Sequence, residues 1–285
     1  MKKNRAGKSQ FIKALIRLTR AGNLLIIAIA QYCTAAFLIR TGTVDDIALL
    51  VLVASTVMIA AAGYIINDYY DVKIDYINKP DRVVIGKTIT RRYAILFHVL
   101  LSLMGISLGL AINWKIGLVN AFSVFLLWLY SNLLKRLPFV GNLAVAVLTG
   151  LSIMVVDFLY QVFNPLIFIY ALFAFFMTLI REIIKDMEDL KGDDTFGCKT
   201  LPIVLGIRQT KMIIYGILVV FAATVVVSNH FYSALPFDYY VLLLFVPLTF
   251  LLYRLIRADM KRDYRVLSNL CKVIMLLGIL SMAFI

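Results

Sequence analysis

The sequence predicts an all-α, polytopic membrane protein with nine transmembrane helices. Hydrophobic residues make up 62% of the 285 residues and the mean hydropathy is +0.91, whereas a soluble domain is only about half apolar. The apolar residues form nine runs near the length that crosses a bilayer, and the positive charges gather in alternate loops. We therefore expect a single membrane domain over residues 1–285.

The predicted spans follow from length, because a helix needs about 20 apolar residues to cross the hydrocarbon. They lie at 22–39, 46–66, 93–111, 115–131, 139–157, 164–180, 211–228, 239–256 and 267–285. The first span follows a basic segment, residues 2–20, whose alternating apolar and charged residues are typical of an interfacial helix. The second runs directly into the polar sequence that begins at Asn67.

The later spans carry further signals. The third contains Gly105 and Gly109, a spacing that permits close helix contact within the bundle or between protomers. A short basic loop, 132–138, separates the fourth and fifth spans. The sixth, 164–180, is rich in phenylalanine and is followed at once by charged residues. The last span begins beside another basic loop, 254–266.

The positive charges predict the orientation. With the N-terminus cytoplasmic and the C-terminus outside, the cytoplasmic segments hold 26 of the 29 Lys and Arg residues, as the positive-inside rule requires. This explains the net charge of +13 without a nucleic-acid partner. No cleavable signal peptide is indicated. The three cysteines are far apart and predict neither a disulfide framework nor a zinc site.

The acidic residues show a pattern that membrane orientation does not explain. Ten of the 16 lie in two cytoplasmic stretches. The first acidic motif, residues 67–75, reads N-D-Y-Y-D-V-K-I-D. On a helix, Asn67, Asp71 and Asp75 share one face, and Asp68 lies one turn before Asp71. Like charges at this spacing destabilise a bare helix, so a cation between them is indicated.

The second acidic motif, residues 181–194, reads R-E-I-I-K-D-M-E-D-L-K-G-D-D. Asp186, Asp189 and Asp193 share a helix face at i, i+3 and i+7, while Glu188 points elsewhere. All of these ligands are oxygens, which select a hard cation. Magnesium takes one or two carboxylates and completes its shell with water and phosphate. Two such motifs interleaved with Lys and Arg therefore predict a magnesium-dependent diphosphate clamp.

An ion pathway of a transporter is the alternative use of such acids, because ionisable residues inside a membrane are its usual mark. The centres of the predicted spans are nearly free of charge, and Asp157 lies at the far end of the fifth. This distribution favours an enzyme over a transporter or channel.

The chain resembles the UbiA superfamily of intramembrane prenyltransferases over nearly its full length. The resemblance is carried by the first acidic motif with I-N-K-P-D-R at 77–82, by Y-S-N-L-L-K-R at 130–136 with G-N at 141–142, and by K-D-M-E-D-L-K-G-D at 185–193. It implies a helical ring around a central cavity, with the two motifs facing each other beneath a cytoplasmic cap. The implied partners are a prenyl diphosphate donor, a lipid-like or aromatic acceptor and membrane lipid.

The resemblance also implies roles for individual residues. One magnesium ion would be bound by Asn67, Asp68, Asp71 and Asp75, and the other by Asp186, Asp189 and Asp193. Asp71, Asp189 and Asp193 are the residues expected to be catalytic. The expected diphosphate contacts are Arg20, Lys79, Arg82, Lys135 and Lys185, and the residues expected to line the cavity are Asn23 and Asn142. The loop from Arg82 to Lys87 departs from the P-I-P-S-G form of relatives, so Lys87 is not assigned.

The acceptor is predicted from the finer resemblance of the second acidic motif. It is most similar to the ether-lipid branch, whose members transfer geranylgeranyl to the hydroxyl of geranylgeranylglyceryl phosphate. Many other relatives alkylate an aromatic acceptor of the 4-hydroxybenzoate, naphthoate or homogentisate type in quinone synthesis, and this remains the alternative. The resemblance places the enzyme in a prokaryotic plasma membrane.

Overall fold

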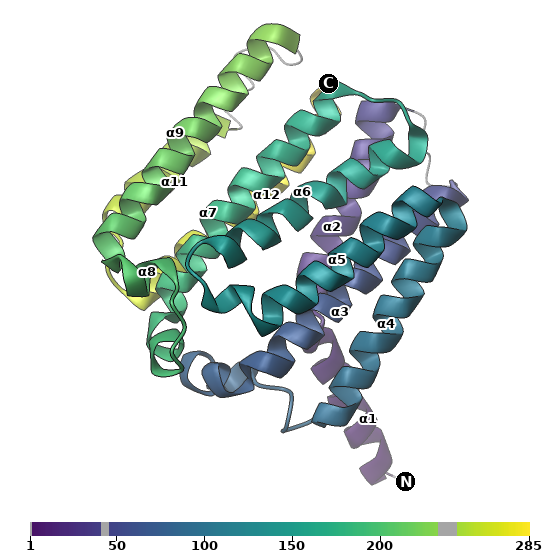
Figure 1. The fold of residues 1–285 in the computed structure, drawn as a ribbon, viewed down its shortest axis with the longest axis vertical. Coiled ribbons are helices and arrows are strands. Elements are labelled where there is room, and N and C mark those ends of the chain that lie inside the picture. Colours follow the sequence, from purple (N-terminus) through teal and green to yellow (C-terminus); the bar gives the residue numbers. More distant parts are fainter. Residues whose placement is uncertain (1, 41–45, 233–243) are drawn as a thin grey trace. The chain divides into compact units, whose positions relative to one another are not determined.

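Helices dominate the computed structural model, which describes residues 2–40, 46–232 and 244–285 (Figure 1). In order they are α1 (Lys2–Leu18), α2 (Ala21–Cys33), η1 (Thr34–Ile39), α3 (Ile47–Asn78), η2 (Pro80–Arg82), α4 (Arg91–Ile112), α5 (Trp114–Asn132), η3 (Leu134–Arg136), α6 (Val140–Tyr160), α7 (Pro165–Thr195), α8 (Leu201–Val204), α9 (Gly206–Tyr232), α11 (Val246–Ile256), α12 (Lys261–Ser281) and η5 (Met282–Phe284). Across these ranges there is no β-strand, only one isolated bridge between Ile85 and Ile89.

The helices confirm the predicted polytopic membrane fold. Within the described ranges, eight helices are long and apolar enough to cross a membrane, and each overlaps one of the predicted spans. The remaining predicted span, 239–256, falls partly outside the described residues. Its described part is the shorter apolar helix α11.

Local sequence explains where several helices begin. The carboxylate of Asp46 accepts hydrogen bonds from the backbone N–H groups of Ala48 and Leu49, at 2.9 and 3.2 Å, and so caps α3. Asn164 caps α7 in the same way, and Pro165 occupies its first turn. Such caps satisfy N–H groups that have no partner inside the helix. Proline is tolerated in the first turn because it has no backbone N–H that would need such a partner.

Helices α3 and α7 are longer than a membrane requires. They contain 32 and 31 residues, which at 1.5 Å per residue is close to 50 Å. The predicted spans end at residues 66 and 180, but both helices continue through the acidic motifs. Neither has a basic residue in its last turn, although a helix C-terminus is normally stabilised by cations. The acids therefore lie at the C-terminal ends of both helices, where negative charge is least favourable.

The chain forms two compact units. The first comprises Met1–Ala28 and Asp45–Leu134, and the second comprises Ile29–Val44 and Lys135–Ile285. Each acidic motif belongs to a different unit. A single domain over residues 1–285 stays a prediction, as do the central cavity and the cytoplasmic cap.

In the first unit, α3 packs against α4 and α5 (Figure 1). A Cβ atom on Gly105 would lie 2.6 Å from the side chain of Ile59 and 3.1 Å from the backbone oxygen of Ser55. Asn120 donates to Ser55 Oγ at 2.6 Å and to the Gly105 carbonyl at 3.0 Å. Of the two contacts that the Gly105–Gly109 spacing permits, the structure therefore shows the one within the chain.

The loop between α3 and α4 is held down by apolar side chains. Val84, Ile85 and Ile89 are buried in a cluster with Leu18 of α1 and Ile65 of α3. The basic N-terminal segment does form a helix, α1, and its last turns belong to this cluster. The cluster fixes the loop that carries Lys79 and Arg82.

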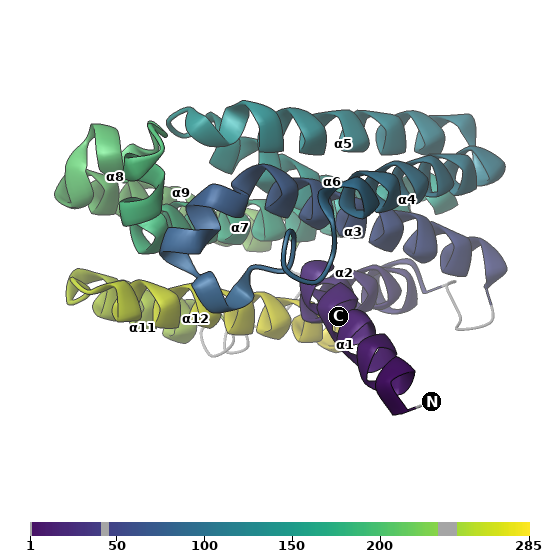
Figure 2. The same cartoon turned by 90° about the horizontal axis from the view of Figure 1, so that it is seen from below.

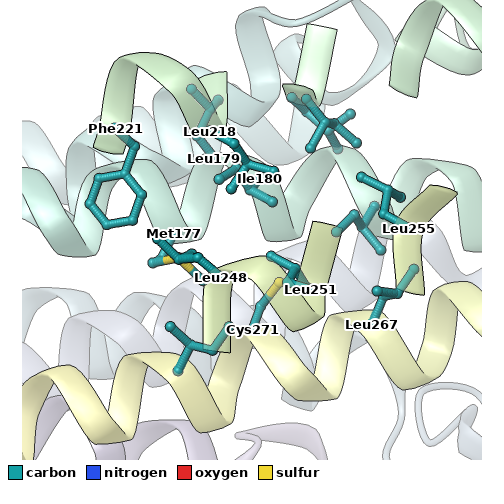
Figure 3. Close-up of a cluster of buried hydrophobic side chains, with 14 of the residues drawn as sticks. Met177, Leu179, Ile180, Leu218, Phe221, Leu248, Leu251, Leu255, Leu267 and Cys271 are labelled. Atoms are coloured by element: carbon teal, nitrogen blue, oxygen red, sulfur yellow. The ribbon is translucent and has the colours of Figure 1, made fainter. Parts of the chain in front are cut away.

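In the second unit, α7 packs against α6, α9 and α12, and α11 runs beside α12 (Figure 2). The core contains Met177 and Ile180 of α7, Phe221 of α9, Leu251 of α11 and Cys271 of α12 (Figure 3). This apolar core surrounds the part of α7 that leads into the second acidic motif.

Candidate active site

The first acidic motif forms a polar cluster at the end of α3. Asn67 Nδ2 donates a hydrogen bond of 2.8 Å to Asp71 Oδ2, and Asp71 is only 4% exposed. The other amide atom, Asn67 Oδ1, is buried and accepts no hydrogen bond. Buried polar atoms are nearly always paired in native structures, so an additional electropositive group is expected at Asn67.

Arg20 approaches this cluster from the turn between α1 and α2. Its guanidinium forms a 2.7 Å ion pair with Asp68 and lies 4.8 Å from the ring centroid of Tyr64. Burial alone would lower the pKa of Arg20, but Asp68, with Tyr64 and Asp75, raises it above its ordinary value. The backbone φ of Arg20 is 53°, in the left-handed region that a non-glycine residue occupies at a cost.

The structure also describes Asn23, Lys79 and Arg82, the remaining predicted residues of the first unit. Asn23 does not extend freely but donates to the Tyr64 hydroxyl at 3.2 Å. Lys79 follows the last residue of α3, and Arg82 is exposed at the end of η2. The unassigned Lys87 donates to the Pro80 carbonyl at 3.0 Å and lies over Tyr76.

The second acidic motif has a related arrangement. Asn142 of α6, which was predicted to line a cavity, donates a 2.8 Å hydrogen bond to Asp186 Oδ2. Asp193 is 2% exposed. The Oδ1 atoms of Asp189 and Asp193 are buried and accept no hydrogen bond, although both side chains interact with other groups. Each motif thus pairs an asparagine with one of its aspartates.

Lys185 and Glu188 have partners on different sides of α7. Lys185 Nζ donates to Glu182 Oε2 at 2.7 Å. Glu188 accepts from Arg265 Nε of α12 at 3.0 Å, which confirms that it points away from the motif face.

Backbone hydrogen bonds bring the remaining basic loop to the second motif. The Cys198 N–H donates to the Asp193 carbonyl, and the Lys199 N–H donates to the Arg136 carbonyl, both at 2.9 Å. The loop with Lys135 and Arg136 is therefore tied to the segment that follows Asp193. This places Lys135 in the neighbourhood of the second motif.

The residues present fit a magnesium ion. Within the described residues, no three His, Cys, Asp or Glu side chains lie close enough to form a complete metal cage. Magnesium does not require one, because water and substrate phosphate supply most of its shell. The all-oxygen donors and the buried, unpaired Oδ1 of Asn67 suit a hard cation. That the two motifs share one diphosphate stays a prediction.

Two further residues of these clusters were missed by the sequence analysis. Tyr64 contacts both Arg20 and Asn23, and Glu182 contacts Arg181 and Lys185. Both lie four residues before an aspartate of a motif, so helical spacing alone extends each face to include them.

The sequence matches the model of the UbiA prenyltransferase family over residues 28–277. Similar curated proteins include two digeranylgeranylglyceryl phosphate synthases. That of Methanosphaera stadtmanae is 34% identical over 224 residues, which cover 78% of this chain and 82% of the relative. That of Saccharolobus solfataricus is 35% identical over 245 residues, covering 84% and 86%.

Solved structures share the fold. One, described as giving mechanistic insights into digeranylgeranylglyceryl phosphate synthase in membranes, has a TM-score of 0.69 and 24% identity, and covers 96% of this chain and 98% of that one. A UbiA homolog from Archaeoglobus fulgidus bound to GPP and Mg2+ has a TM-score of 0.70 and 15% identity, and covers 95% and 100%. With this fold and the family match over most of its length, the chain belongs to the UbiA prenyltransferase family and is an integral membrane prenyltransferase.

Proposed function

We propose that this prenyltransferase uses magnesium to transfer a geranylgeranyl group from its diphosphate to the hydroxyl of geranylgeranylglyceryl phosphate, in ether-lipid synthesis. The observation that carries this acceptor is the similarity, at 34% and 35% identity, to digeranylgeranylglyceryl phosphate synthases over more than four fifths of their length. The magnesium proposal is supported by the oxygen ligands of both motifs and by the Mg2+ bound to a structural relative. Family membership decides against the ion-pathway alternative.

The two motifs are proposed to hold the donor from both sides. By the predicted alternation of spans, α3 and α7 both end on the cytoplasmic face. Asn67, Asp68, Asp71 and Asp75 would hold one ion, and Asp186, Asp189 and Asp193 the other. Magnesium, when bound, supplies positive charge that offsets the charge developing on the leaving diphosphate.

The basic residues complete the charge balance. Arg20, Lys79, Arg82, Lys135 and Lys185 are proposed to contact the diphosphate as the allylic C–O bond breaks and its electron pair passes to the leaving group. Exclusion of water from the site would protect the allylic carbon from hydrolysis. The acceptor oxygen then forms the new C–O bond and releases its proton.

The test uses purified protein in detergent with labelled geranylgeranyl diphosphate and a panel of acceptors. We expect product with geranylgeranylglyceryl phosphate and none with 4-hydroxybenzoate, a naphthoate or homogentisate. A chelator should abolish diphosphate release, and added magnesium should restore it. Product on an aromatic acceptor alone would move the enzyme to the quinone branch.

Substitutions distinguish the loss of a metal ligand from a general loss of folding. Asp71→Asn and Asp189→Asn keep side-chain volume but remove a charged ligand, so we expect each to lower diphosphate release by about 100-fold or more. Asp157→Asn is the control, since Asp157 is as buried as Asp71 but accepts a 3.3 Å hydrogen bond from the Asn164 N–H, at the opposite end of α6 from Asn142. Normal activity in both motif variants would remove the site assignment.

A further inference from the structure

The acidic face of α7 begins one turn before the aspartates, at Glu182. Glu182, Asp186, Asp189 and Asp193 are spaced i, i+4, i+7 and i+11, which places them on one face of the helix. Glu182 is 5% exposed, and it lies on the membrane side of the motif, next to the apolar core formed by Ile180, Ile183 and Ile184 and their neighbours. A carboxylate at this depth requires charged partners.

Both carboxylate oxygens of Glu182 are engaged by cations of its own helix. Oε1 accepts from Arg181 Nη1 at 2.8 Å, and Oε2 accepts from Lys185 Nζ at 2.7 Å. The side chains of Arg181 and Lys185 are only 14% and 22% exposed. Charge-assisted hydrogen bonds shielded from water in this way are strong. Glu182 therefore serves its neighbouring cations, and its oxygens are not presented to a metal.

The hydrogen bond to Glu182 restricts the position of the flexible Lys185 side chain. A lysine ammonium is a point charge on a four-carbon stem with many rotamers. Lys185 is followed directly in sequence by Asp186, and the other motif aspartates lie further along the helix. Glu182 holds the ammonium on the membrane side of these acids. The ammonium carries three N–H donors and keeps its positive charge while it contacts Glu182, so its charge still acts on a nearby phosphate.

We propose that Glu182 is a positioning residue for prenyl transfer, which holds Lys185 where charge develops on the leaving diphosphate. This inference rests on the proposed function, because Lys185 is there a diphosphate contact. A cation already in place at that point lowers the barrier without reorganising during the reaction. Arg181, on the other oxygen, balances the second half of the carboxylate charge.

A double-mutant cycle tests the proposal with diphosphate release as the readout. We expect Glu182→Gln to lower kcat by about 10- to 100-fold, the range seen when an outer-shell partner is lost, with a smaller change in the KM of the donor. In the Lys185→Gln background, the same substitution should change kcat less than twofold, because Glu182 acts through Lys185. A purely structural role would give the same factor in both backgrounds, and that result would overturn the proposal.

Two variants complete the design. Glu182→Asp keeps the charge but shortens the side chain, so it remains testable if Glu182→Gln fails to fold. We expect it to lower kcat, and we expect this loss to disappear in the Lys185→Gln background. Glu188→Gln is the matched control, since Glu188 is buried on the same helix but pairs with Arg265. We expect it to lower thermal stability and leave kcat unchanged.

If Lys185→Gln alone keeps full activity, the proposed diphosphate contact is wrong, and the proposed role of Glu182 is wrong with it. If the variants change kcat for diphosphate release as expected but no product forms on geranylgeranylglyceryl phosphate, only the proposed acceptor is wrong.

Discussion

Two asparagines orient carboxylates of the acidic motifs. Asn67 donates to Asp71 and Asn142 donates to Asp186, each at 2.8 Å. The first pair lies on one helix, whereas the second joins α6 to α7. An amide donor fixes one oxygen of its carboxylate and so sets the direction of the other, which is how an outer-shell partner tunes a metal ligand.

At Asn142 this reasoning gives a measurable effect. Asn142→Ala removes the donor to Asp186, so we expect the magnesium concentration for half-maximal activity to rise by about 10- to 100-fold. The measurement is a magnesium titration of diphosphate release. Asn120→Ala is the control, because Asn120 is an equally buried asparagine that bonds Ser55 and Gly105. It should lower stability and leave the magnesium dependence unchanged, and an unchanged titration for Asn142→Ala would contradict the role assigned to the amide.

The sequence grouped residues within each acidic motif but did not reveal their distant partners. Spacing along one helix was enough to group Asn67 with Asp71, because i and i+4 residues always meet on a helix. The ion pair between Arg20 and Asp68 joins residues 48 positions apart and depends on a left-handed turn at Arg20. No local pattern predicts such a turn at an arginine, so its partner could not be derived from the residues alone.

Among the elements, α3 and α7 show why hydropathy misjudges helix ends. The apolar runs stop near residues 66 and 180, but a helix continues until its backbone is interrupted. For α3 the interruption is Pro80, two residues beyond Asn78, since the residue before a proline avoids helical geometry. For α7 it is Gly197, whose φ of 71° follows the last turn. Hydropathy located the membrane-spanning segments, whereas proline and glycine determined where α3 and α7 end.

The contact between α3 and α4 predicts the effect of adding a methyl group. Gly105→Ala would place a Cβ atom 2.6 Å from Ile59 Cγ1 and 3.1 Å from a backbone oxygen, and such overpacking costs about 1–3 kcal/mol. We expect a lower midpoint of thermal unfolding in detergent. Gly216→Ala, on α9, is the control, because nothing lies within 4 Å of its added Cβ and alanine favours a helix. Equal midpoints for the two variants would contradict the close packing.

For the whole molecule, the distribution of charge predicts the orientation in the membrane. The polar ends of α3 and α7 carry the acidic motifs, and most of the cations lie in the segments expected on the same side. The family match over residues 28–277 includes parts of both compact units. The polytopic helical fold was predictable because apolar length and loop charge are summed over many residues. That the two motifs face each other is implied only by the family resemblance, because neither sum contains long-range packing.

Cysteine labelling tests this orientation. In a variant without Cys33, Cys198 and Cys271, we expect a cysteine introduced by Asp81→Cys to react with an impermeant maleimide only from the cytoplasmic side. One introduced by Lys115→Cys, in the first turn of α5, should react only from outside. Both native side chains are exposed, so access to the reagent is limited by the membrane. Reaction of both positions from one side would contradict the predicted alternation.

The acidic C-terminal ends of α3 and α7 have a consequence for the order in which the donor and its counter-ions arrive. Under the proposed function, a bare pyrophosphate group meets carboxylates and the negative poles of two helices, and all of them repel it. The same group already carrying its divalent ions is attracted to both. Under the proposed function, we therefore expect the enzyme to discriminate between metallated and metal-free donor, with an excess of the uncomplexed isoprenoid acting as a weak competitor for the site.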